Sequence, residues 1–153
     1  MAEEKQIVLT GQQLMNAYRQ EESKLQALQQ RMQQLNGLLM EANIAEDAVN
    51  EIKKAAKNEK IIVDLGAGTY VEAALDGNNG FKTGLAGTIL QNSDSKGALE
   101  YLKKQKDMLQ GEISGIAKEH EKTIASLNEI ASWLQAGENQ ARKELAEKHR
   151  HGD

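Results

Sequence analysis

The chain contains no proline and no cysteine, and among its 153 residues it has only one Trp, one Phe and three Tyr. The absence of cysteine excludes disulfide bonds and thiol chemistry, and it fits a cytosolic protein. Proline interrupts helices, so its absence, combined with abundant Gln, Glu and Lys, favours long uninterrupted helices over a compact globular core.

Other absences narrow the class further. No apolar run approaches the roughly 18 residues that a membrane-spanning helix needs, so we expect no membrane segment. A formal net charge of −4 argues against nucleic acid as a partner, because phosphate binding needs a basic surface. The first residues, Met1-Ala2-Glu3-Glu4, are acidic where a secretory signal would be basic. We therefore expect a cytoplasmic protein.

Apolar residues recur at alternating spacings of four and three through the N-terminal part of the chain. This spacing predicts a coiled-coil helix over residues 11–57, with Thr10 and Gln13 forming a capping box at its start. Lys57 and Asn58 suit its end. Nine of the eleven positions of this first seam are apolar. The eleven positions are Leu14, Tyr18, Glu21, Leu25, Leu28, Met32, Leu35, Leu39, Ala42, Glu46 and Val49.

A second, looser seam predicts a C-terminal helix over residues 95–148, with N-cap candidates in residues 92–95. The stretch 95–141 equals the first helix in length, which favours an antiparallel coiled coil within the chain. Nine of the thirteen positions of this second seam are apolar. The thirteen positions are Leu99, Leu102, Lys106, Leu109, Ile113, Ile116, His120, Thr123, Leu127, Ile130, Leu134, Gly137 and Ala141. Because Glu46, like Glu21, is polar, we expect it to set the register or to mark a place where the helices separate.

Residues 61–90 have the β-branched composition of two hairpins. Gly66-Ala67-Gly68 separates the two strands of the first, and Ala86-Gly87 lies within the second. Isolated hairpins are marginally stable and expose edges that can pair with another chain. The sequence therefore predicts an oligomer.

Residues 61–75, Gly84–Ile89 and Ala98–Lys106 resemble the alpha-class subunits of prefoldin. The resemblance implies a hexamer of two alpha-type and four beta-type subunits, whose hairpins form a double β-barrel with six coiled coils projecting from it. It also implies ATP-independent capture of unfolded proteins and their transfer to a group II chaperonin. Asp64 departs from the family pattern, which usually has proline there.

We therefore expect one domain over residues 1–153 of the α+β class, mostly α. It would be a long antiparallel coiled coil joined by two hairpins that assemble into a barrel between subunits. The expected partners are beta-type prefoldin subunits, unfolded clients and a group II chaperonin. The alternative is a structural coiled-coil adaptor or a filament-forming prefoldin-like protein.

No catalytic constellation stands out, so we expect neither an enzyme nor a cofactor. Gly66-Ala67-Gly68 lacks the third glycine and the lysine of nucleotide-binding loops. His149 and His151 have metal-like spacing without a second ligand pair, so we expect them to be solvated and expect no metal site.

Two sets of apolar residues are candidates for function. The first set would form the core of an intersubunit barrel or, alternatively, a small core within one chain. It consists of Ile61, Val63, Leu65, Val71, Leu75, Phe81, Leu85 and Ile89. The second set lies near the tips of an antiparallel coil and would bind clients: Ile7, Val8, Leu9, Met15, Tyr18, Ile130, Trp133 and Leu134. Tyr18, Ile130 and Leu134 are also seam positions, so packing within the coil is their alternative role. Met and large aromatic side chains suit contact with many unrelated apolar sequences.

Overall fold

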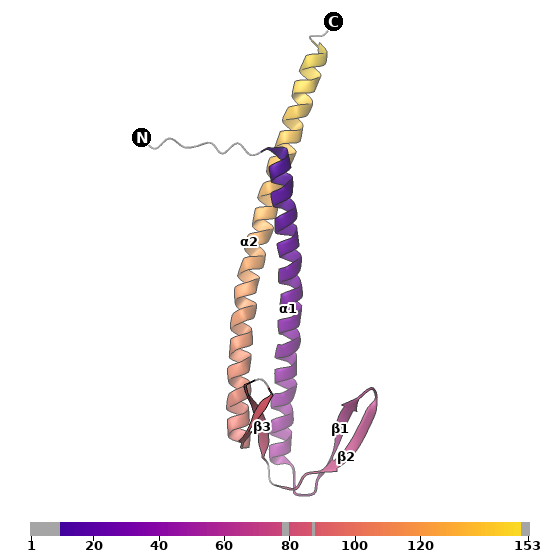
Figure 1. Ribbon diagram of the computed structural model, residues 1–153, viewed down its shortest axis with the longest axis vertical. Helices are drawn as coiled ribbons and strands as arrows, with labels where there is room; N and C mark the ends of the chain where they lie inside the picture. Colours follow the sequence, from indigo (N-terminus) through magenta and orange to yellow (C-terminus); the bar gives the residue numbers. More distant parts are fainter. Residues whose placement is uncertain (1–9, 78–79, 87, 151–153) are drawn as a thin grey trace, which may run out of the picture. The chain divides into compact units, whose positions relative to one another are not determined.

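The computed structural model describes residues 10–77, 80–86 and 88–150 of the chain. Its elements follow in the order helix, two hairpins, helix (Figure 1). The fold class, mostly helical with two small antiparallel sheets, is as predicted. The elements are α1 (Gly11–Lys54), β1 (Lys60–Gly66), β2 (Thr69–Ala74), β3 (Phe81–Ala86), β4 (Ile89–Ser93) and α2 (Ser95–Arg150).

The chain divides into two compact units, which we describe separately. The hairpin unit is Leu35–Ile113, and it contains both hairpins with the adjoining parts of the two helices. The terminal unit contains the rest of α1, up to Gln34, and the rest of α2, from Ser114 onward.

The first helix begins where its capping box predicts. The backbone N–H of Thr10 donates to Gln13 Oε1 over 2.9 Å, and the Gln13 N–H donates to Thr10 Oγ1 over 3.3 Å. Two of the N–H groups that a helix start leaves unpaired are thereby satisfied.

The end of α1 differs from the prediction of residue 57, because the helix stops at Lys54. Asn58 does adopt a left-handed conformation, with φ of 67°. Its N–H, however, donates to the carbonyl of Leu75 over 2.7 Å, and the Leu75 N–H donates to Glu59 over 2.9 Å. The backbone at Asn58 and Glu59 is thus hydrogen-bonded to the end of the first hairpin instead of continuing the helix, so α1 ends early.

The second helix is capped by Asp94, one of the predicted candidates, whose Oδ1 accepts the Gly97 N–H over 2.7 Å. It runs on to Arg150, so α2 has 56 residues and α1 has 44. The helix predicted over residues 95–148 is thus two residues longer than predicted, whereas the expectation that the two arms match in length is wrong. Residues 138–148 are mostly Glu, Lys, Arg, Ala and Gln, which favour helix, and Gly137 alone does not stop it.

In the terminal unit, α1 and α2 lie side by side and antiparallel (Figure 1). Lys24 on α1 pairs with Glu119 on α2 over 3.1 Å, while Met15 and Tyr18 share a groove with residues near Leu134. The predicted seam is confirmed here, since its positions from Leu14 to Met32 and from Ile116 to Leu134 are buried or half-buried.

In the hairpin unit the seam continues as the best-buried part of the helices. Leu35, Ala42 and Val49 of α1 are buried, as is Ala98 of α2. The two polar seam positions of this unit, Glu46 and Lys106, form an ion pair across the helices, with side chains 32% and 19% exposed. This pairing favours the register role for Glu46, one of its two predicted roles.

Each hairpin is a separate two-stranded antiparallel sheet, β1 with β2 and β3 with β4. In the first, Ala67 and Gly68 form a two-residue turn with φ of 52° and 74°, the positive values that a tight hairpin of matching twist requires. A bulge precedes each turn, between Asp64 and Gly66 and between Gly84 and Ala86.

The ion pair across the seam makes a stability prediction. Glu46→Gln removes the carboxylate while keeping the side chain's size, and it leaves the Lys106 ammonium partly buried without its partner. We expect the free energy of unfolding, measured by urea denaturation with circular dichroism, to fall by about 1.5 kcal/mol. Glu51→Gln is the matched control, because the Glu51–Lys54 pair is exposed on a single helix and exposed pairs contribute little. Equal effects of the two variants would contradict a register role for Glu46.

A second stability prediction concerns Thr123, which is 1% exposed. Its Oγ1 has no hydrogen-bond partner among the described residues. Because a buried unpaired hydroxyl is costly, Thr123→Val should raise the free energy of unfolding by about 1–2 kcal/mol. Thr123→Ser, which keeps the hydroxyl and loses a methyl group, should lower it by about 1 kcal/mol. A valine variant less stable than the parent would show that the hydroxyl is satisfied.

Candidate assembly and capture surfaces

The first hairpin has one apolar face and one mixed face. Strand pairing places Ile61 opposite Ala73 and Val63 opposite Val71, and alternation puts all four on the same face. Val63 and Val71 are both exposed. An apolar face of this kind is stable only when something covers it.

The other face of this hairpin mixes charge with apolar surface. Lys60 and Glu72 form an ion pair over 2.6 Å. Ile62 lies opposite Glu72 and Tyr70 opposite Asp64, and the Ile62 side chain is 75% exposed. Ile62 and Tyr70 were not among the predicted assembly residues, although strand alternation in the sequence assigns them to this second face.

Asp64, the departure from the family pattern, has a local role. Its Oδ1 accepts the backbone N–H of Gly66 over 2.7 Å, at the bulge before the turn. Asp side chains commonly fold the chain in this way, by bonding to the backbone two residues on. The Asp64 side chain therefore stabilises the start of the turn by a hydrogen bond.

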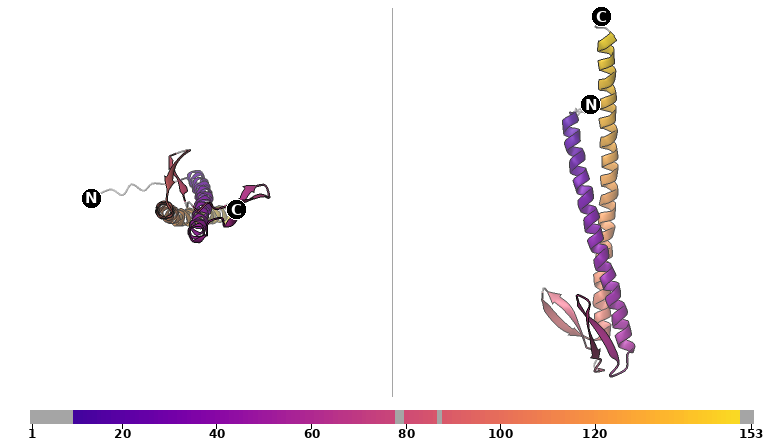
Figure 2. Two further views of the ribbon diagram at one scale, coloured as in Figure 1. Left: turned by 90° about the horizontal axis from the view of Figure 1, so that it is seen from below. Right: turned by 90° about the vertical axis from the view of Figure 1, so that its right-hand side faces the viewer.

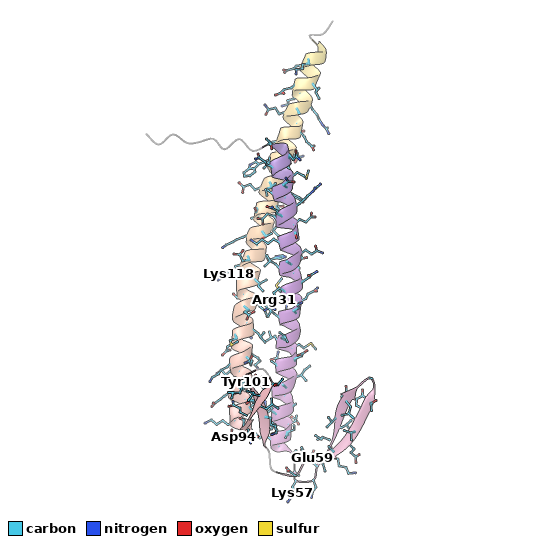
Figure 3. All side chains as sticks on the ribbon, in the orientation of Figure 1. Arg31, Lys57, Glu59, Asp94, Tyr101 and Lys118 are labelled. Carbon is cyan, nitrogen blue, oxygen red and sulfur yellow. The ribbon has the colours of Figure 1, made fainter. Side chains whose placement is uncertain are left out.

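The second hairpin lies against the start of α2. Tyr101 of α2 lies beside this hairpin (Figure 3). A Cβ added at Gly84 would lie 3.2 Å from the Tyr101 hydroxyl, so glycine allows the close approach. Thr83 is buried, and its Oγ1 accepts a hydrogen bond from Gln91 Nε2 over 3.3 Å. The side chains around the turn are nevertheless exposed: Leu85, Ile89 and Leu90.

The eight predicted assembly residues thus form no closed core in this chain. Three are half-buried, namely Ile61, Leu75 and Phe81. The other five are exposed: Val63, Leu65, Val71, Leu85 and Ile89. The hairpins do not form the alternative, a small core within one chain, because apolar side chains on both hairpins are exposed to solvent.

The predicted tip residues fall into three groups. Met15, Tyr18 and Leu134 line a groove of about 320 Å³ in the terminal unit, together with Ala131, Gln135 and Glu138. Trp133 is 48% exposed and lies outside that lining, whereas Ile130 is buried in the seam. Ile7, Val8 and Leu9 lie outside the described residues. The sequence pattern did not identify Ala131, Gln135 and Glu138, because a groove depends on which side chains flank the seam.

Charged groups on the terminal unit lie on its surface. Glu119 accepts a hydrogen bond from Lys24 over 3.1 Å and lies 3.7 Å from Lys122. The hydrogen bond and positive charge of Lys24, followed by the charge of Lys122, hold the pKa of the Glu119 carboxyl below its ordinary value. The carboxylate therefore stays charged to lower pH than an isolated Glu, but both side chains of the pair are about half exposed, so its effect on stability is small.

Beside this pair, His120 Nε2 lies 3.5 Å from Gln29 Nε2. In the part of the chain that the structure describes, no three His, Asp or Glu side chains gather in a way that could hold a metal ion. His149 and His151 have no described side chains. Neither described helix has an apolar stretch long enough to cross a membrane.

The chain is an antiparallel helical pair joined by two hairpins whose apolar faces are uncovered. These features are typical of a coiled-coil subunit of an oligomer. The chain belongs to the prefoldin family, since the model of that family, described as prefoldin subunit, matches residues 22–140. This confirms the resemblance seen in the sequence. A curated relative, prefoldin subunit alpha from Thermofilum pendens, is 27% identical over 107 residues, which cover 70% of this chain and 83% of the relative. This match and the two hairpins support the alpha type.

Two solved structures share the fold. The cryo-EM structure of filamentous PFD from Methanocaldococcus jannaschii has a TM-score of 0.65 at 12% identity, covering 79% of this chain and 98% of that one. The crystal structure of the prefoldin beta subunit from Thermococcus strain KS-1 has a TM-score of 0.55 at 17% identity, covering 86% of this chain and 94% of that one. Membership of a chaperone family implies assembly with other prefoldin subunits.

Proposed function

We propose that this chain is the alpha-type subunit of an ATP-independent holdase, which captures unfolded proteins in the cytoplasm and transfers them to a group II chaperonin. The observation that carries the proposal is that the two units expose two different kinds of apolar surface. The hairpins expose strand faces, which suit permanent assembly. The helices expose a groove with a flexible Met and an aromatic ring, which suits reversible binding.

Assembly follows from the energetics of the hairpins. A two-stranded sheet is marginal in water, and covering an apolar side chain contributes about 1.5–3 kcal/mol when burial is complete. Val63 and Val71 lie opposite each other on the apolar face of the first hairpin. We propose that beta-type subunits cover this face in a closed hexamer, with an intersubunit barrel as its core.

The assembly proposal can be tested on this face without weakening the strand itself. Val63→Thr/Val71→Thr keeps both residues β-branched and of similar size. We expect it to weaken association with beta-type subunits by about 3 kcal/mol, roughly a hundredfold, because two buried methyl groups become hydroxyls. Analytical ultracentrifugation of the mixture measures this change.

Ile62→Thr on the mixed face is the control for that experiment, and we expect a smaller loss of association from it. A complex unaffected by the double substitution would contradict assembly through the Val63–Val71 face. Unchanged far-ultraviolet circular dichroism of each variant checks that the helices remain folded.

Client capture is proposed for the terminal unit. The groove between the helices presents Met15, Tyr18 and Leu134, and Trp133 exposes a large ring close by in sequence. Met is unbranched and adapts to irregular surfaces, so one site can accept many apolar sequences. Each site would bind weakly, and several sites in one complex would together supply the affinity.

The capture proposal predicts a defect confined to this unit. Met15→Ser and Trp133→Ser remove side chains that are 42% and 48% exposed, so they should leave the coil folded. We expect each to weaken the affinity of one capture site by about 1 kcal/mol, roughly fivefold. Suppression of client aggregation by the assembled complex should fall accordingly.

Met108→Ser is the matched control, because Met108 is an exposed methionine in the hairpin unit. It should leave aggregation of the client unchanged. If the wild-type complex forms and fails to suppress aggregation at all, the holdase function is wrong, whatever the variants do.

The alternative is a filament-forming prefoldin-like protein, or a structural adaptor, in which the hairpins only join subunits. The similarity to a filamentous prefoldin favours considering it. Electron microscopy and sedimentation of the chain, alone and mixed with beta-type subunits, distinguish the chaperone hypothesis from the filament hypothesis. Long polymers formed without beta-type subunits would favour the filament, and a closed complex formed only with them would favour the chaperone.

A further inference from the structure

The helix α2 extends past the beginning of α1 within the terminal unit (Figure 2). Met15 and Tyr18 share a groove with α2 residues as far as Glu138. Continuing this antiparallel register brings Gly11, the first residue of α1, level with about Ala141. Since α2 ends at Arg150, roughly nine residues, or about 14 Å of helix, have no partner in α1.

The apolar seam face of α2 does not end where its partner does. Leu134, Ala141 and Leu145 are spaced by seven and four residues, which places them on one face of the helix. Leu134 is half-buried, whereas Leu145 is 59% exposed. We call the two uncovered positions, Ala141 and Leu145, the overhang stripe.

We propose that Ile7, Val8 and Leu9 of the same chain dock on the overhang stripe and extend the helical contact beyond the start of α1. These three consecutive apolar residues immediately precede Thr10, the residue that caps α1. The residues before them are mostly polar or charged, so the apolar residues of this segment are concentrated directly before Thr10.

The cap of α1 would direct this segment toward the seam. With Thr10 as N-cap, Leu9 and Leu14 occupy the two positions of a hydrophobic staple, a contact that fixes the angle at which the chain enters a helix. Leu14 is itself a half-buried seam residue. A staple would therefore bring Leu9 to the seam side and direct Val8 and Ile7 along α2.

The distances allow the contact. Four extended residues reach about 13 Å, which is the span from Gly11 back to Ile7. Leu145 lies four residues beyond Ala141, or about 6 Å along the α2 axis. Docking needs no change in either helix. It also does not depend on client capture, so it can hold or fail independently of the proposed function.

The chain's lack of cysteine makes the test direct. Val8→Cys/Leu145→Cys places one thiol in the segment and one on the stripe of the full-length chain. Val8→Cys/Lys143→Cys is the matched control, because Lys143 is two residues away and faces the opposite side of α2. Both positions are exposed, and both tethers have nearly the same length.

In a glutathione redox buffer at low protein concentration, we expect the effective concentration for the intrachain disulfide to be about tenfold higher for the Leu145 pair than for the Lys143 pair. Equal values would overturn the proposal, since they would mean that the segment samples all sides of α2. A disulfide between two chains at Leu145 would also overturn it and would assign the stripe to a second copy.

Amide hydrogen exchange provides a second measurement without cysteine. Leu145→Ser should accelerate exchange at residues 7–10 severalfold, because it removes the apolar surface that protects them. Met108→Ser, in the hairpin unit, should leave exchange at those residues unchanged. Fast exchange at residues 7–10 in the parent chain, unaltered by Leu145→Ser, would contradict docking.

Discussion

Antiparallel pairing of α1 with α2 is the constraint on which the other features depend. Within the hairpin unit it is fixed by apolar packing at Leu35, Ala42 and Val49 and by the Glu46–Lys106 ion pair. An apolar seam alone tolerates slippage by a heptad, whereas a single polar pair inside the seam is satisfied in only one register. Ion pairs of this kind contribute more to register than to stability, since desolvation offsets much of their attraction.

The hairpins follow a different rule, because what stabilises them is incomplete within one chain. The first hairpin is joined to the segment after α1 by hydrogen bonds at Asn58 and Glu59, and the second lies against Tyr101. Each is thus attached at its base, while apolar side chains such as Val63 and Leu85 stay exposed. Binding to partner subunits would stabilise such hairpins by mass action, so their folding and the assembly of the complex are coupled.

Much of this fold could be predicted from the sequence because its determinants are local or periodic. The capping box needs only Thr10 and Gln13, and the seam needs only a regular spacing of apolar residues. The end of α1 was mispredicted because Asn58 bonds to Leu75, the residue that follows the far strand of the hairpin. The helix predicted over residues 95–148 runs to Arg150. Arms of equal length were expected because only the stretch 95–141 was compared with the first helix, although the residues beyond it also favour helix.

The candidate sites were harder to predict than the fold, for a related reason. Spacing assigns a residue to a seam, but it does not show how deeply the residue is covered. Ile130 and Leu134 are both seam positions, yet Ile130 is buried and Leu134 is only half-buried. The partner of Glu46 was also not predicted, although Lys106 lay on the second seam, because pairing two polar positions requires the register of the whole coil.

The polar seam positions have different hydrogen-bond and ion-pair partners in the two units. This difference affects how readily the two helices separate in each unit. The hairpin unit pairs Glu46 with Lys106, so separating its helices would break an ion pair and expose well-buried apolar residues. The terminal unit has a buried, unpartnered Thr123 hydroxyl and a long Gln29–His120 contact. Separating the helices there hydrates a group that folding had left unsatisfied, so local opening costs less. The groove that we propose for capture lies in the terminal unit, so easier local opening there would let its side chains adjust to an irregular client.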